Sequence, residues 1–147
     1  MRKNEAFTLV EIMIVVAIIA VLAAVAVPAF MRARERTRTT KIVETLRVAS
    51  DAFVMYAADH NGYPNAAGAG VIPTGMGLYL QRLNWTQATP VGGRWQWQGD
   101  KSGGTVTIAQ PTGTLQQGLD IDSMLDDGNP DAGAFRISNN HWRLTVE

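Results

Sequence analysis

The sequence of 147 residues contains no cysteine, which excludes disulfides, thiolate metal ligands and thiol nucleophiles. It also has no net charge, because thirteen basic side chains balance thirteen acidic ones, and we expect no nucleic-acid partner. Catalytic motifs are missing as well. Its two histidines, His60 and His141, are isolated, and no phosphate-binding loop or nucleophile elbow occurs. We therefore expect no enzymatic activity.

Residues 12–30 contain no ionisable side chain, and this apolar run is close to the roughly 20 residues that cross the hydrocarbon of a bilayer. A short polar leader with Arg2 and Lys3 precedes it. One carboxylate, Glu11, lies next to its start. Because a charge inside hydrocarbon costs about 2.5–3.5 kcal/mol on insertion scales, a membrane segment that keeps one is a functional-site candidate. The sequence therefore predicts a membrane stage in which Glu11 acts with a partner.

Two simpler interpretations of the apolar segment stay open. The triplet Ala24-Val25-Ala26 has the small-x-small pattern of a signal peptidase site, which would give a secreted chain that begins at Val27. A permanent membrane anchor would also explain the length of the segment. Neither interpretation accounts for Glu11, and no polar step separates the apolar run from the site at which a signal peptidase would cut.

The N-terminal residues are similar to those of a known family. A short basic leader that ends in a small residue, the motif Phe7-Thr8-Leu9-Val10-Glu11 and an apolar helix with Pro28 resemble the type IV prepilins and the pseudopilins of type II secretion systems. The resemblance covers about the first 60 residues. It implies that prepilin peptidase cuts between Ala6 and Phe7 and that Phe7 is then N-methylated. The departure is Ala6, where the family usually has glycine.

The resemblance also supplies a partner for Glu11. In a filament, the Glu11 carboxylate of one subunit could meet the new Phe7 amine of its neighbour where little water is present. Deleting one member of a buried ion pair strands the other at a cost of about 3–5 kcal/mol, so Glu11 would report the correct axial register. Two alternatives stay open, in which Glu11 reaches the headgroups or pairs with its own N-terminus. Pro28 cannot donate to the carbonyl of Ala24, and we expect it to let the helix adapt during assembly.

The helical pattern continues beyond the apolar run as an amphipathic helix. Apolar side chains recur at helical spacing through residues 32–60, at Val43, Leu46, Ala49, Phe53 and Ala57. Asn61-Gly62, followed by Pro64, predicts the end of the helix. Residues 32–47 hold six basic and two acidic side chains, which favour a solvated or intersubunit face, with anionic lipid as the alternative ligand.

From residue 61 onward the composition changes to glycine, threonine, asparagine and glutamine with scattered tryptophans. Period-two alternation predicts two hairpins, formed by residues 94–98 with 105–108 and by residues 135–138 with 141–146. The apolar face of this antiparallel sheet can cover the stripe of the helix. We therefore predict an α+β, pilin-like fold, with a long N-terminal helix packed on a small sheet and the tryptophans in the core rather than on a carbohydrate-binding face. Residues 1–6 are predicted to be a cleaved leader, and residues 7–31 a transmembrane or filament-core helix. Residues 32–60 are predicted to be an amphipathic helix, and residues 61–147 a β-rich head.

An acidic stretch without basic residues, LDIDSMLDDGNPDAGAF, lies between the two hairpins. Asp127, Asn129 and Asp131 alternate there in a turn and present oxygen ligands at the first, third and fifth positions, as calcium loops do. Asp122 and Asp126 could add further ligands. The residues that follow exclude an EF-hand, whereas some pseudopilins hold calcium in a loop before their last strands. Turn chemistry alone, with Asp and Asn side chains capping their own backbone, is the alternative.

Together these features predict a structural filament subunit. We interpret the chain as a type II secretion pseudopilin, with a type IV pilin as the alternative within the family. The resemblance implies three partners: further copies of the chain, prepilin peptidase and the secretion or pilus assembly machinery. It places the chain in the bacterial inner membrane before assembly and in a periplasmic or cell-surface filament afterwards. A monomeric, membrane-anchored periplasmic binding module is the alternative from another class.

Overall fold

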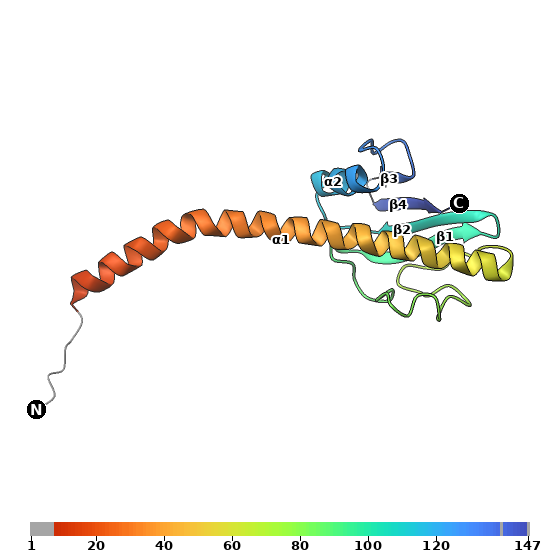
Figure 1. Cartoon of the computed structure of the whole chain (residues 1–147), viewed down its shortest axis with the longest axis horizontal. Coiled ribbons are helices and arrows are strands. Elements are labelled where there is room, and N and C mark those ends of the chain that lie inside the picture. Colours follow the sequence, from red (N-terminus) through yellow and green to blue (C-terminus); the bar gives the residue numbers. More distant parts are fainter. Residues whose placement is uncertain (1–7, 139, 147) are drawn as a thin grey trace, which may run out of the picture. The chain divides into compact units, whose positions relative to one another are not determined.

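A computed structural model describes residues 8–138 and 140–146 (Figure 1). The elements follow one another as α1 (Leu9–His60), β1 (Arg94–Asp100), β2 (Gly103–Ala109), α2 (Leu115–Leu125), β3 (Phe135–Ser138) and β4 (His141–Val146). Contacts divide the chain into two compact units, Met1–Thr37 and Arg38–Glu147. The boundary lies inside α1, and the second unit, Arg38–Glu147, is called the head from here on.

The first helix has the C-terminal end that the sequence predicts. It ends at His60, and Asn61 then adopts a φ of 55°, which a non-glycine residue seldom does outside helix caps and turns. The Gly62 amide donates to the Ala57 carbonyl over 3.1 Å, the six-to-one bond that closes helices of this kind. At the other end α1 begins at Leu9, and Phe7 lies outside the described residues. The helix runs through Pro28 without a break.

Within the first unit the apolar part of α1 is exposed throughout. Every described residue from 8 to 37 is exposed, although the most apolar window has a mean hydropathy of 3.0. By length and composition, α1 is the one helix among the described residues that could cross a membrane. This stretch therefore has a large apolar surface that no described residue covers.

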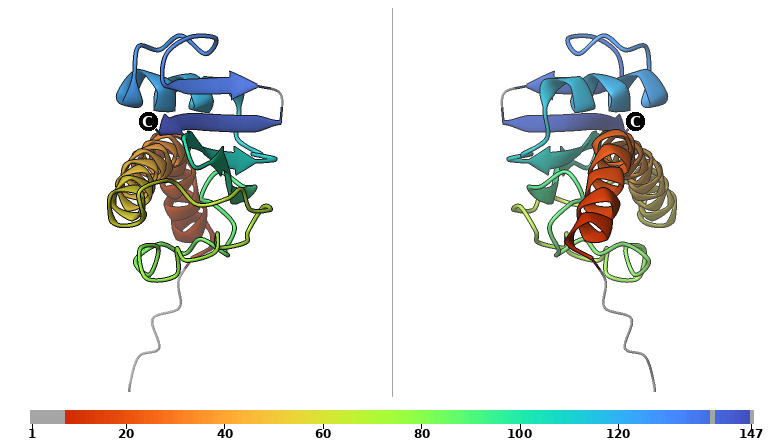
Figure 2. Two further views of the ribbon diagram at one scale, coloured as in Figure 1. Left: turned by 90° about the vertical axis from the view of Figure 1, so that its right-hand side faces the viewer. Right: turned by 90° about the vertical axis from the view of Figure 1, so that its left-hand side faces the viewer.

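The sheet in the head has four antiparallel strands in the order β1-β2-β4-β3. Both predicted hairpins are confirmed, and the strands are longer than the first pattern indicates: β1 and β2 pair from Arg94↔Ala109 to Asp100↔Gly103. The second hairpin pairs Phe135 with Leu144 and Ser138 with His141. Figure 2 shows the C-terminal half of α1 against one face of this sheet. The α+β class predicted from the sequence is confirmed.

The core lies between that face of the sheet and the helix stripe. Ile42, Leu46 and Phe53 are completely buried, and the Trp97 ring stacks on Phe53 with a centroid separation of 4.0 Å. Such aromatic pairs contribute about 0.5–1.5 kcal/mol beyond the burial of their area. All four tryptophans are at most 3% exposed, which confirms their core role and rules out a tryptophan-lined carbohydrate face.

The second helix, α2, is a correction to the sequence analysis, which treated its residues as part of the acidic linker. Thr114 caps it by accepting from the Gln117 amide over 3.2 Å, and glutamine at this third position is typical of capping boxes. Gly118 brings α2 against the sheet, since a Cβ there would lie 2.9 Å from Ile137 Cδ1. Asp122 is thereby carried into the interior of the head, where it is completely buried.

Candidate functional site

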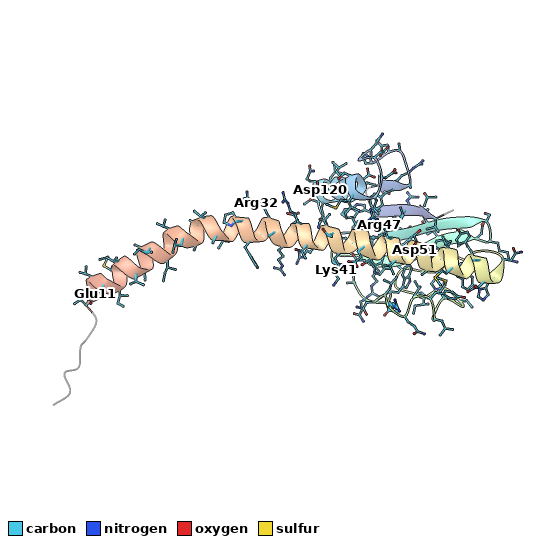
Figure 3. All side chains as sticks on the ribbon, in the orientation of Figure 1. Glu11, Arg32, Lys41, Arg47, Asp51 and Asp120 are labelled. Carbon is cyan, nitrogen blue, oxygen red and sulfur yellow. The ribbon has the colours of Figure 1, made fainter. Side chains whose placement is uncertain are left out.

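The first candidate site is the start of α1, where Thr8 and Glu11 form a capping box. Glu11 Oε2 accepts from both the Thr8 amide and the Thr8 hydroxyl at 2.8 Å, and the Glu11 amide donates to Thr8 Oγ1 over 3.3 Å. These bonds satisfy backbone donors that an isolated helix start leaves free. Figure 3 labels Glu11 at this end of the helix. The sequence analysis missed the box, although Thr8-Leu9-Val10-Glu11 has its spacing.

This capping box answers part of the question about the partner of Glu11. In the single subunit, the carboxylate is held by Thr8 of its own chain. The predicted partner, the Phe7 amine, and the predicted cleavage site between Ala6 and Phe7 lie outside the described residues. Glutamine serves in a capping box as glutamate does, so the box needs the oxygen but not the charge. The charge on Glu11 is therefore available for a second role.

The apolar helix that follows carries small side chains around Pro28. Alanines lie at positions 20, 23, 24, 26 and 29, and they allow apolar helices to approach closely. Pro28 removes one backbone donor from the helix interior. A face of this kind packs on other apolar helices or on lipid.

The second candidate site is in the head, around the buried carboxylate of Asp122. Neither of its oxygens has a hydrogen-bond partner among the described residues. Burial, followed by the charges of Asp127 and Asp126, raises the pKa of Asp122 above its ordinary value. Ligand oxygens of Asp122, Asp126 and Asp127 lie within 4.8 Å of one another. A buried, unpartnered carboxylate next to two others is costly unless a proton or a cation neutralises it.

Backbone contacts hold the neighbouring acidic side chains in place. Asp126 Oδ2 accepts from the Ala134 amide and, over 3.3 Å, from the Phe135 amide. It lies so close to Gly133 that a Cβ there would come within 1.8 Å of it. Only a glycine therefore fits at position 133 with this arrangement.

In the turn after α2, Asp and Asn side chains cap their own backbone, as the alternative to calcium binding predicts. Asp127 Oδ1 accepts from the Asn129 amide over 2.8 Å, and Asn129 Oδ1 accepts from the Asp131 amide over 3.2 Å. Asp131 lies outside the group of three close carboxylates. The structure thus brings together Asp122, Asp126 and Asp127, while the side chains of Asp127 and Asn129 cap the turn and Asp131 contributes only its amide.

The geometry of the three carboxylates fits a calcium ion. Oxygen ligands lie 2.3–2.6 Å from Ca²⁺, so two ligands of one ion are at most about 5.2 Å apart, and the 4.8 Å limit of this group satisfies that condition. The donors are all carboxylate oxygens, which suit hard cations such as Ca²⁺ better than the softer metals. The orphaned oxygens of Asp122 are the observation that most favours a cation here.

A basic side chain from α1 contacts the same end of α2. Arg47 Nη2 donates to the Met124 carbonyl over 2.7 Å, at the C-terminal turn of α2. A cation at this end is favourable because the helix dipole is negative there. Arg47 thus has a structural role within the head. The sequence analysis counted it only among the basic side chains of a solvated or intersubunit face.

Comparison with known proteins places these features in a family. Residues 1–27 match the prokaryotic N-terminal methylation motif. The chain is 34% identical over 109 residues to the type IV wide pilus major component PilA4 of Thermus thermophilus, a match that covers 74% of this chain and 82% of that protein. This chain belongs to the type IV pilin and type II secretion pseudopilin family. The match to PilA4 is too long to be confined to the N-terminal helix, so the head belongs to the family as well.

Both branches of the pilin family occur among the relatives. Type II secretion system core protein G of Klebsiella pneumoniae is 39% identical over 64 residues, which are 44% of this chain and 46% of that protein. The corresponding protein of Aeromonas hydrophila is 36% identical over 63 residues, 43% of this chain and 44% of that protein. The major type IV pilin PilA1 of Clostridium difficile has the same fold, with a TM-score of 0.53 at 13% identity over 76% of this chain and 95% of that one.

Proposed function

We propose that this pilin-family chain is a structural subunit that is stored in the inner membrane and drawn from it into a helical filament of identical subunits. The observation that carries the proposal is the exposed apolar half of α1. A fully apolar helix of this length is stable in lipid or in a bundle of similar helices, and unstable in water. The role is structural rather than catalytic, in keeping with the names of the relatives.

Assembly can be tested by cross-linking, because the chain has no cysteine of its own. We expect a single cysteine at Val16 or at Ala20, on the exposed apolar half of α1, to give disulfide-linked dimers in cells with the assembly machinery. A cysteine at Gln81, exposed in the head, serves as the matched control for random collision. If the helix cysteines give no more dimer than Gln81→Cys, the chain is a monomeric membrane-anchored module. Where the filament is found, sheared from the surface or retained in the periplasm, distinguishes a pilus from the type II pseudopilus that we favour.

We further propose that prepilin peptidase removes residues 1–6 and that Phe7 becomes the methylated N-terminus. The match to the methylation motif over residues 1–27 supports this. Mass spectrometry of the N-terminal peptide should find Phe7 with one added methyl group. An Ala6→Gly variant, which restores the family residue, should be processed at least as fast. An N-terminus at Val27 or an intact Met1 would contradict the proposal.

We propose that the head binds one calcium ion through Asp122, Asp126 and Asp127. The ion would neutralise three carboxylates and order the segment between α2 and β3. Asn129 and Asp131, which the sequence analysis placed among the first ligands, are then not ligands: the Asn129 side chain holds the turn by accepting from the Asp131 amide.

A further inference from the structure

The face of the sheet turned away from α1 carries two arginines that lie directly opposite each other. Arg136 on β3 and Arg143 on β4 are partners in the antiparallel ladder, so their side chains leave the same face of the sheet. Both are exposed. Like charges at directly opposed positions destabilise a sheet, so this pair calls for an explanation.

Neutral atoms are the only partners that these arginines have among the described residues. Arg136 Nε donates to the Gly133 carbonyl over 3.3 Å, and Arg143 Nη2 donates to the Ser138 hydroxyl over 3.4 Å. Neither guanidinium forms an ion pair with a described carboxylate. Two positive charges therefore lie side by side with most of their donors unused.

A groove of about 650 Å³ surrounds the pair, and no described residue that lines it is acidic. The neighbouring rung of the ladder places Thr105 opposite Thr145, and both threonines line the groove. The Thr145 hydroxyl has no hydrogen-bond partner among the described residues. In Figure 2 no described helix covers this face of the sheet.

We propose that this groove binds a phosphate group, held by Arg136 and Arg143 together and by the hydroxyl of Thr145. Two guanidinium groups match an oxyanion that carries close to two negative charges, as inorganic phosphate or a phosphate monoester does near neutral pH. A single carboxylate would leave one of the two arginines uncompensated. The strand spacing of about 4.8 Å lets two adjacent arginines reach oxygens of one group. The inference does not depend on assembly, since every residue involved lies in the head.

The test measures binding of inorganic phosphate to the full chain in a non-ionic detergent, with a chelator present so that the acidic site plays no part. We expect saturable binding by titration calorimetry, and at least about a tenfold loss of affinity in Arg143→Gln and in Arg136→Gln. Arg82→Gln, at an exposed arginine that lines no part of the groove, is the matched control and should bind as the original chain does. Citrate, which offers carboxylates instead, should bind more weakly than phosphate.

A second variant separates binding from folding. Arg136→Glu places opposite charges on facing positions, so it should raise the melting temperature in phosphate-free buffer and abolish phosphate binding. Equal affinity in the Arg82→Gln and Arg143→Gln variants would overturn the proposal. So would an Arg136→Glu variant that is folded and still binds phosphate, or the absence of saturable binding by the original chain.

Discussion

Glu11→Gln should leave membrane insertion intact and nearly abolish filament assembly. Glutamine can take over the capping box with Thr8, so the start of α1 is preserved. What the substitution removes is the negative charge, which we propose meets the Phe7 amine of a neighbouring subunit. A charge left without its partner in a dry interface costs about 3–5 kcal/mol per contact, and a filament repeats the contact in every subunit. Quantifying filaments sheared from cells, beside the membrane-inserted fraction, measures both effects.

Thr8→Val is the matched control, because it removes the hydroxyl from the box and keeps the carboxylate. Loss of a capping side chain costs about 0.5–2 kcal/mol, which α1 can tolerate, so assembly should remain close to normal. The opposite pattern, with Thr8→Val defective and Glu11→Gln normal, would mean that Glu11 serves only to cap its own helix. Normal assembly by both variants would show that neither role matters.

Calcium should raise the melting temperature of the head in the full chain, and Asp122→Asn should remove the response. A ligand that binds only the folded state stabilises it by RT ln(1 + [L]/Kd), which is about 2.7 kcal/mol at a hundredfold excess over Kd. Asp131→Asn tests which residues are ligands. It should keep the calcium response if Asp122, Asp126 and Asp127 hold the ion, and lose it if the ligands are those that the turn pattern suggests. Equal melting of the original chain in calcium and in chelator would refute the site.

Asp122→Asn also tests how Asp122 makes the stability of the head depend on pH when a chelator removes calcium. Its pKa is raised in the folded head, so the folded state favours the protonated form. Below the ordinary pKa of aspartate this carboxyl costs nothing, and the head loses stability as the pH rises through the raised pKa. The Asp122→Asn head should therefore melt higher than the original chain at neutral pH and approach it in acid. Asp100, whose pKa the Ser102 hydrogen bonds lower, acts in the opposite direction in both proteins and cancels in the difference.

Most of the fold follows from local patterns in the sequence. The end of α1 is encoded in Asn61 and Gly62, and alternation of apolar and polar residues encodes both hairpins. The order of the strands is different, because it depends on which strands become neighbours. The exposed arginine pair follows from the predicted second hairpin, because its two-residue turn fixes a register in which Arg136 lies opposite Arg143.

The acidic site shows where sequence reasoning fails for a physical reason. Five aspartates in a short stretch suggest a solvated loop, and alternation at the turn draws attention to Asp127, Asn129 and Asp131. The N-cap at Thr114 instead begins a helix, whose period carries Asp122 to its buried face beside Gly118 and Ile121. Burial of a charged residue runs against its intrinsic preference, so composition cannot reveal it. A search for the capping-box pattern, Ser or Thr followed three residues later by Glu or Gln, would have found both this helix start and the one at Thr8.

The distribution of the tryptophans gives the two halves of the subunit separate optical signals. All four lie in the head and are almost completely shielded from water, and the apolar half of α1 contains none. Intrinsic tryptophan fluorescence therefore reports the unfolding of the head alone, even when α1 is in a micelle, a bilayer or a filament. Quenchers confined to the lipid phase should leave that emission unchanged, whereas a tryptophan placed at Phe30 would respond to them. A pair of spectra can then follow extraction from the membrane and folding of the head as independent events.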